Sequence, residues 1–137
     1  MKYLVIVIRT LLGVMFLFGG LSYFVNIVDM SETASKWQEP TKKFMEVMTQ
    51  SNYFSVVKIL EIIGGAFLLT GFFVPLGLTI IGPILVNILL FDFCLEKKAD
   101  PPVLVGLVLF LGVFYAYRDS FRSVFAAYPD HCCSKKA

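Results

Sequence analysis

Four long apolar stretches run along the chain, and short polar segments separate them. They cover residues 3–28, 53–73, 76–95 and 101–118. A helix needs roughly 20 apolar residues to cross the hydrocarbon core of a bilayer, where backbone polar groups must pair within the helix itself. The pattern therefore predicts an all-α integral membrane protein, a single domain built as a bundle of four transmembrane helices.

The polar segments between these stretches indicate how the helices follow one another. Residues 74–77, with the sequence Val-Pro-Leu-Gly, predict a tight turn, so the second and third stretches would form an antiparallel hairpin. The longer segment at residues 29–52 contains Pro40 at the start of a short helix, which would carry Phe44 and Met48 on one face. We expect this helix to lie on the membrane surface, with an ordinary packed loop helix as the alternative.

The composition supports a membrane protein rather than a soluble one. Hydrophobic residues make up 58% of the 137 residues, against about 45–50% in soluble domains. A soluble chain of this length has one modest core and would leave much of this apolar surface in water. The net charge of +2 is too small to indicate nucleic acid as a partner.

The distribution of positive charge predicts the orientation of the chain in the membrane. The side of the membrane that holds both termini would carry six lysines and arginines: Lys2, Arg9, Arg118, Arg122, Lys135 and Lys136. The opposite side would carry five: Lys36, Lys42, Lys43, Lys97 and Lys98. Because cytoplasmic segments are enriched in these residues, we expect both termini, and a tail at residues 119–137, in the cytoplasm beneath a bacterial inner membrane.

Charged side chains inside membrane spans are costly, so each is a candidate functional residue. Lys58 and Glu61 are three residues apart in the second stretch and share a helical face, while Asp92 lies in the third. If the hairpin turn is centred near Pro75, residue i lies level with about residue 150 − i. Lys58 then lies level with Asp92, and Glu61 lies near the level of Asn87. We expect these polar groups to meet inside the hairpin at one depth.

The first stretch would complete the same site. It reaches this depth where Gly19 and Gly20 leave space, with Tyr23 and Asn26 just beyond. We therefore predict a small internal polar pocket, open toward the non-cytoplasmic side and formed by Tyr23, Asn26, Lys58, Glu61, Asn87 and Asp92. Alternatively, the charged groups only satisfy one another and fix helix register, or some of them face water at a frayed helix end. Asn87 and Asp92 are five apart, about 140° around an α-helix, so one of them would face another span.

Other features of the sequence give weaker indications. Arg9 would reach lipid phosphate or pair with Asp119, and Arg118 would extend to the membrane interface. No metal site is predicted, because the three cysteines form no C-x-x-C pair. The 14 phenylalanines would face lipid or line a cleft for an isoprenoid quinone.

Glycines recur at helical spacing in two of the apolar stretches. Gly13 and Gly20 are seven residues apart, and so are Gly64 and Gly71. Each pair would lie on one face of its helix and let a neighbouring helix approach closely.

Three of the stretches carry short motifs. Residues 9–20 fit R-x-x-x-G-x-x-F-x-x-x-G, residues 61–71 fit E-x-x-G-G-x-x-L-x-x-G, and residues 83–91 fit P-x-x-x-N-x-x-x-F. In this order they resemble the DoxX/DoxX-like family of small four-span membrane proteins, whose third motif reads P-x-x-x-N-x-x-x-F-H. The fourth stretch is similar only as a hydrophobic run. Where the family often has His after that Phe, this chain has Asp92, so a proton or metal role that rests on the His does not carry over.

The resemblance implies a four-helix membrane bundle but says little about function. Some members resemble membrane subunits of thiosulfate:quinone oxidoreductases, others are linked to redox homeostasis, and a distant animal branch resembles receptor-assembly chaperones. We expect an accessory subunit of a membrane redox or stress-response system, without independent catalytic activity, that holds a quinone or a lipid near Glu61.

Two alternatives remain at this point. One is a non-enzymatic assembly or scaffold protein, whose segment at residues 29–52 recognises a membrane protein partner. The other is a small transporter or channel subunit, which would have to work as a homo-oligomer because four short helices form no wide pore.

Overall fold

The computed structural model describes residues 2–25, 35–98 and 100–122, and within these ranges the chain is helical. Its helices are α1 (Lys2–Phe24), α3 (Glu39–Gln50), α4 (Tyr53–Thr70), α5 (Val74–Leu90), η1 (Phe91–Glu96), α6 (Pro101–Ala116) and α7 (Arg118–Phe121). α1, α4 and the continuous α5–η1 segment are long and apolar enough to cross a membrane, and α6 is a shorter apolar helix. The predicted all-α membrane bundle is confirmed.

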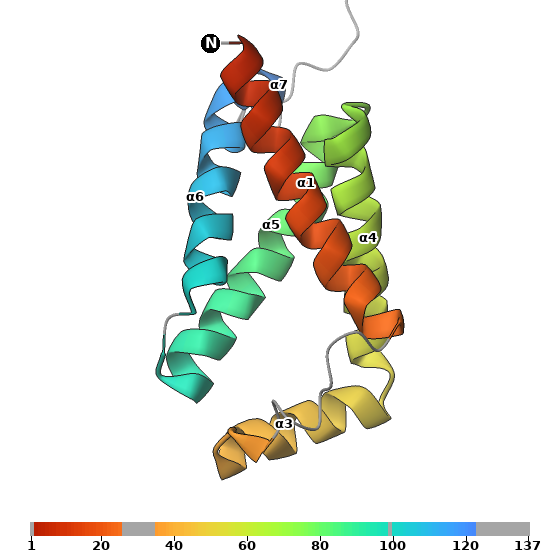
Figure 1. Ribbon diagram of the computed structural model, residues 1–137, viewed down its shortest axis with the longest axis vertical. Coiled ribbons are helices and arrows are strands. Elements are labelled where there is room, and N and C mark those ends of the chain that lie inside the picture. The colour runs from red at the N-terminus through yellow and green to blue at the C-terminus, as the bar shows by residue number, and fades with distance from the viewer. Residues whose placement is uncertain (1, 26–34, 99, 123–137) are drawn as a thin grey trace, which may run out of the picture.

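The four apolar helices surround one core. α1 contacts α4 and α6, and α5 contacts the same two helices from the other side. α3 lies across the end of the bundle that is opposite the N-terminus (Figure 1), where it contacts α4 and η1. Thr41 and Met45 of α3 are buried in this contact. α3 is therefore packed against the end of the bundle and does not lie on lipid alone.

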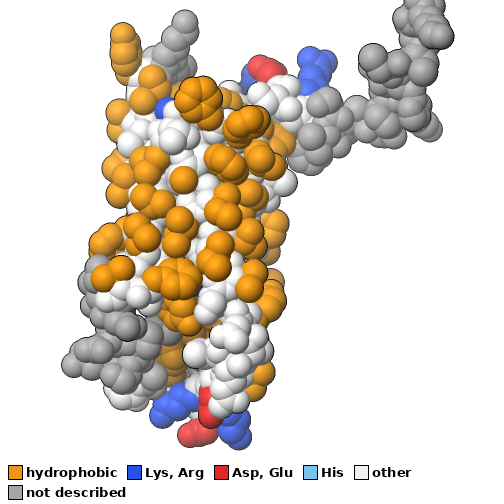
Figure 2. Space-filling view, turned by 90° about the vertical axis from the view of Figure 1, so that its right-hand side faces the viewer, with side chains coloured by type: hydrophobic (Ala, Val, Ile, Leu, Met, Phe, Trp, Pro, Cys, Tyr) orange, Lys and Arg blue, Asp and Glu red, His pale blue; other side chains and the backbone are white. Residues whose placement is uncertain are grey.

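The outer surface of the bundle is apolar over its middle. Large hydrophobic side chains are exposed on the outer faces of α1, α4, α5 and α6. Figure 2 shows hydrophobic side chains covering the central band of one face, with charged side chains gathered toward the two ends. Such a band would be an unfavourable surface in water and matches the hydrocarbon region of a bilayer. The chain is an integral membrane protein.

α1 and α4 cross with their backbones in contact. A Cβ atom added to Gly65 of α4 would lie 2.9 Å from the carbonyl oxygen of Gly13, and one added to Gly13 would lie 3.0 Å from the carbonyl oxygen of Gly65. About two helical turns farther along α1, a Cβ added to Gly20 would lie 3.0 Å from the carbonyl oxygen of Lys58. Gly13 and Gly20 thus face α4 together, as the seven-residue spacing predicts.

The second glycine pair, Gly64 and Gly71, faces two different helices. Gly64 faces α5, since a Cβ there would lie 2.7 Å from Cγ1 of Ile81. Gly71 faces α1, since a Cβ there would lie 2.6 Å from Nη1 of Arg9. Gly64 and Gly71 thus allow two different neighbours to approach closely, because α4 has helices on two sides and Gly71 lies at its C-cap.

The hairpin turn lies three residues before its predicted place. α4 ends at Gly71, whose left-handed backbone (φ 76°) forms the helix C-cap, and Phe73 is also left-handed (φ 54°). α5 then begins at Val74 and includes Pro75 in its first turn. The predicted turn at residues 74–77 is wrong because proline fits the first helical turn, whose N–H groups have no helical partner.

The last apolar helix is also shorter than predicted. α6 begins at Pro101 as expected but ends at Ala116, and the short helix α7 follows Tyr117. Phe121 of α7 is buried, with its ring centroid 5.0 Å from that of Phe114. The start of the predicted tail therefore belongs to the core, and residues 123–137 lie outside the described residues.

Candidate functional site

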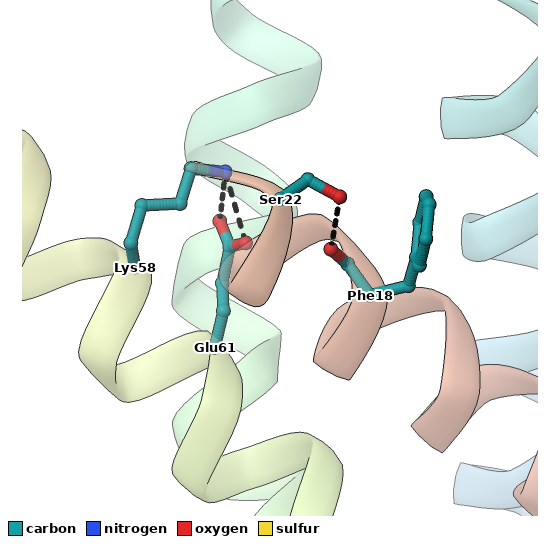
Figure 3. Close-up of polar contacts among 4 residues, drawn as sticks. All are labelled: Phe18, Ser22, Lys58 and Glu61. Carbon is teal, nitrogen blue, oxygen red and sulfur yellow. Dashed lines mark hydrogen bonds and ion pairs between the residues drawn. The ribbon is translucent and has the colours of Figure 1, made fainter. Parts of the chain in front are cut away.

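The most buried carboxylate of the bundle is paired with a lysine on its own helix. Nζ of Lys58 lies 2.9 Å from Oε2 and 3.1 Å from Oε1 of Glu61 (Figure 3), and Glu61 is only 3% exposed. The pair is three residues apart on α4, a spacing that places two side chains on one helical face. On the α1 side, the hydroxyl of Ser22 donates to the carbonyl oxygen of Phe18 and not to Glu61 (Figure 3).

Lys58 has a second favourable contact. Its Nζ lies 5.1 Å from the centroid of the Phe54 ring, a distance at which an ammonium group is attracted to the face of an aromatic ring. The side chain of Lys58 is 17% exposed, so part of it still reaches the surface. The ammonium is therefore held between a buried carboxylate and an aromatic ring.

A cavity of about 280 Å³ adjoins this pair. It is lined by α3, by α4, by the junction of α5 with η1 and by the first turn of α6, at the end of the bundle where α3 contacts α4 and η1. Its polar lining residues are Lys58, Glu61, Asn87, Asp92 and Asp100. Its apolar lining residues are Trp37, Phe44, Met45, Met48, Phe54, Val57, Ile88, Phe91 and Val103. The cavity thus combines a mostly apolar wall with a few polar groups, the usual composition of a ligand site.

The structure places the four polar residues predicted within the hairpin around this one cavity, but with different pairing. Lys58 bonds Glu61, and no ion pair with Asp92 is formed. The shifted turn explains this, because a centre near Phe72 places Lys58 level with Val86. Asp92 then lies six residues, or about 9 Å, farther along the axis.

Asp92 reaches the cavity from a π-helix. It is 5% exposed and belongs to η1, which follows α5 without interruption. Hydrogen bonds from residue i to i+5 give a π-helix more residues per turn than an α-helix, so successive side chains are separated by a smaller angle. Asn87 and Asp92 both line the cavity, and the backbone of Asp100, just before α6, forms a hydrogen bond with the Asp92 carboxylate. Asp92 therefore meets the start of the fourth span, as its five-residue spacing from Asn87 predicts. Short π-helical segments are frequent at functional sites.

One oxygen of the Asp92 carboxylate has no hydrogen-bond partner among the described residues. The backbone of Asp100 forms a hydrogen bond with this carboxylate. Its Oδ2 atom is buried and makes no hydrogen bond with any residue that the structure describes. A buried, unpaired polar atom costs free energy. A hydrogen-bond donor supplied by a ligand would therefore be favourable at Oδ2 of Asp92.

Tyr23 does not line the cavity but contacts two residues of α4 beside it. Its hydroxyl lies 3.2 Å from Oγ of Ser55, and its ring centroid lies 5.1 Å from that of Phe54. Tyr23 therefore fixes the ring on which the Lys58 ammonium lies. Asn26, the remaining predicted member of the site, lies outside the described residues.

The two arginines predicted at the interface are far from this cavity and do not line it. Arg9 lies against Gly71 at the C-terminal end of α4, and its Nη1 is 3.5 Å from the hydroxyl of Tyr117. A cation is favourable at a helix C-terminus, where carbonyl groups lack helical partners. Arg118 lies 4.5 Å from the centroid of the Tyr115 ring. Within residues 2–25, 35–98 and 100–122, Arg9 forms no ion pair with Asp119.

The residues that sequence reasoning missed come mainly from α3 and its preceding segment. Thr41, Met45 and Met48 recur at intervals of four and three residues, a spacing that does indicate one buried helical face. The pattern does not show what that face covers, and nothing in the sequence singles out Trp37 or Asp100 as cavity residues. No cluster of three or more His, Cys, Asp or Glu side chains in the described part of the chain is arranged to hold a metal ion.

These features define a small helical membrane protein with a glycine-mediated helix crossing and a polar cavity at one end of its bundle. Residues 4–92 match the DoxX family, and the chain belongs to this family. The match extends from α1 to Asp92 in η1 and so includes both the Gly13–Gly65 crossing and most of the cavity wall. Neither the curated proteins nor the solved structures contain a match to this chain.

Proposed function

We propose that this DoxX-family protein is an accessory subunit of a membrane redox or stress-response system, and that it holds a lipid-like or quinone-like ligand beside Glu61. The cavity of about 280 Å³ that reaches Lys58 and Glu61 is the observation that supports this proposal. Ligand pockets have volumes of about 300–1,000 Å³, so this one suits a ring or a headgroup whose tail extends into the bilayer.

The walls of the cavity have the chemistry that such a ligand needs. The Lys58 ammonium can donate to a carbonyl or phosphate oxygen, and the Asn87 amide can donate or accept. Phe54 and Phe91 offer flat apolar surfaces to a ring, and both line the cavity. A scaffold protein would need only a fully packed polar network here, and the cavity therefore favours the ligand-binding role over the assembly role.

The proposal gives the chain a binding role in a larger system. The cavity residues supply hydrogen bonds, charge and apolar contact, so a redox reaction at this site would be completed by the quinone and by a partner subunit. α3 is the element best placed to meet such a partner, because it lies across the end of the bundle and exposes Val47 on its outer surface.

A ligand that occupies the cavity should co-purify with the protein. The protein would be purified in a mild maltoside detergent, extracted with organic solvent and analysed by mass spectrometry for lipids and quinones. Val103→Phe would fill the cavity, since Val103 lines it from α6. Leu104→Phe is the matched control, because Leu104 is the next residue and is exposed.

The proposal expects one lipid or quinone species enriched in the wild-type and Leu104→Phe extracts and depleted at least severalfold in the Val103→Phe extract. Equal amounts in all three extracts would mean that the species belongs to the annular lipid, and would count against a ligand in the cavity. Proteins retained on the same affinity resin identify the partner subunit, and a redox enzyme among them supports the accessory role.

A further inference from the structure

We propose that the ligand of this cavity carries a protonated amine, which Asp92 binds through Oδ2, the carboxylate oxygen that accepts no hydrogen bond from any residue the structure describes. This inference rests on the proposed ligand-binding role and adds to it the charge of the ligand. Alkylammonium is the common chemistry, and it is offered both by aminolipid headgroups and by soluble amines.

The charges around the cavity are unbalanced. Three carboxylates line it, those of Glu61, Asp92 and Asp100, but Lys58 is the one cation among the described lining residues. Lys58 is already bonded to Glu61 through both carboxylate oxygens. Two negative groups, Asp92 and Asp100, therefore face the cavity without a cationic side chain.

Asp92 cannot be relieved by solvent in the way that Asp100 can. Asp100 is exposed, whereas Asp92 is 5% exposed and its Oδ2 atom is buried. Lys97 and Lys98 follow η1 in the chain, but both are exposed and neither lines the cavity. A buried carboxylate needs a positive partner or several donors, and a ligand in the cavity can supply both through an ammonium group.

The protein already shows how an ammonium is held at this site. Lys58 is bound by a carboxylate on one side and by the face of Phe54 on the other. Phe91 and Phe44 line the same cavity as Asp92, and their ring centroids are 5.9 Å apart. Carboxylate groups combined with aromatic faces are a known means of binding organic cations. A second ammonium beside Asp92 would repeat the Lys58 arrangement.

The single tryptophan of the chain allows a direct test. Trp37 lines the cavity, so its fluorescence reports on occupancy without an added label. Protein in dodecyl maltoside, which has no charge and no amine, would be titrated with octylamine. Octylamine is protonated at neutral pH, as a lysine side chain is with a pKa of about 10.4. Octanol, with the same chain and no charge, and octanoate, with a negative charge, are the matched probes.

We expect octylammonium to change the Trp37 emission in a saturable way and to bind at least about tenfold more tightly than octanol or octanoate. Asp92→Asn keeps the shape of the side chain and should weaken octylammonium binding about tenfold or more, since hydrogen bonds to charged groups are the stronger ones. Asp119→Asn removes the same charge on α7, away from the cavity, and should leave the dissociation constant unchanged. If Asp92→Asn does not fold, Asp100→Asn should weaken binding severalfold.

Competition then identifies the source of the amine. Short-chain phosphatidylethanolamine that displaces octylammonium, when short-chain phosphatidylglycerol does not, assigns the ligand to aminolipids. Displacement by a soluble polyamine such as spermidine assigns it to free amines. Either result supports an amine ligand.

Two results would overturn the inference. The first is equal affinity for octylammonium and octanol, and the second is an unchanged dissociation constant in Asp92→Asn. If a neutral probe or a short-chain quinone still binds in a saturable way, the cavity remains a ligand site and only the charge of the ligand is wrong. If no probe of any charge changes the Trp37 emission, the proposed function fails as well.

Discussion

Replacement of Gly65 by alanine tests the closest contact in the bundle. The added Cβ would lie 2.9 Å from the carbonyl oxygen of Gly13 and 2.9 Å from the backbone nitrogen of Leu17. Both atoms belong to the backbone of α1, so no side chain can rotate away to make room. α1 and α4 would have to separate by about 0.5 Å to restore an ordinary contact, and this gap forfeits part of the dispersion energy along the crossing.

The size of the effect follows from two opposing contributions. Overpacking in a well-packed interior costs about 1–3 kcal/mol, while glycine to alanine within a helix returns about 0.5–1 kcal/mol. The free energy of unfolding should therefore fall by about 1–2 kcal/mol. For a chain of this size, that corresponds to a decrease of several degrees in the midpoint of thermal unfolding.

Thermal unfolding in maltoside detergent, followed by circular dichroism or light scattering, would measure this change. Gly112→Ala is the matched control, because its Cβ would lie 3.7 Å from Cγ2 of Ile8, an ordinary contact. The control should be neutral or slightly stabilising. The double variant Gly13→Ala/Gly65→Ala should lose less than the sum of its parts, since both changes act on one contact. Equal stability of Gly65→Ala and Gly112→Ala would refute the crossing.

Three further predictions concern the site, the turn and the orientation. Glu61→Gln should lower the free energy of unfolding by about 1–3 kcal/mol because Lys58 loses its charged partner, and adding Lys58→Met should recover part of the loss; no recovery in a thermal melt would contradict the pairing. Gly71→Ala should lower the free energy of unfolding by about 1–2 kcal/mol, because the backbone of residue 71 is left-handed and the added Cβ would meet Arg9, so a higher midpoint of unfolding would contradict this turn. With both cysteines of the C-terminal segment replaced by serine, an impermeant maleimide should label the exposed Cys94 in intact cells. Labelling only after permeabilisation would place this end of the bundle in the cytoplasm.

The helices could be predicted from hydropathy because the hydrocarbon core sets the length of a span and requires its backbone polar groups to pair within the helix. The turn could not be placed as well. Pro75 and Gly71 both fit a turn, and only the left-handed backbone at Gly71 and Phe73 shows which of them the chain uses. Three residues of displacement were enough to change the partner of Lys58 from Asp92 to Glu61, because one helical turn is only 3.6 residues long.

The cavity could be predicted only in part. Buried charges in apolar stretches are conspicuous, and this feature alone identified Lys58, Glu61 and Asp92 as candidates. The aromatic wall was not predictable, because Trp37 and Phe44 come from a polar segment whose position over the bundle depends on tertiary packing. The π-helix at Phe91–Glu96 has no recognised pattern in the sequence, since it depends on one altered set of backbone hydrogen bonds.

The accessibility of one nitroxide label would test most directly whether the hairpin encloses a polar cavity. In a cysteine-free protein in lipid nanodiscs, Asn87→Cys would place the label on an exposed residue that lines the cavity, and Val86→Cys would place it on the outer surface, where Val86 is 56% exposed and does not line the cavity. The two sites have nearly the same depth in the bilayer. We predict that a water-soluble nickel chelate relaxes the label at position 87 more strongly, whereas oxygen dissolved in the acyl chains relaxes the label at position 86. Equal relaxation by oxygen at both positions would mean that this face of α5 contacts lipid, and would contradict the cavity.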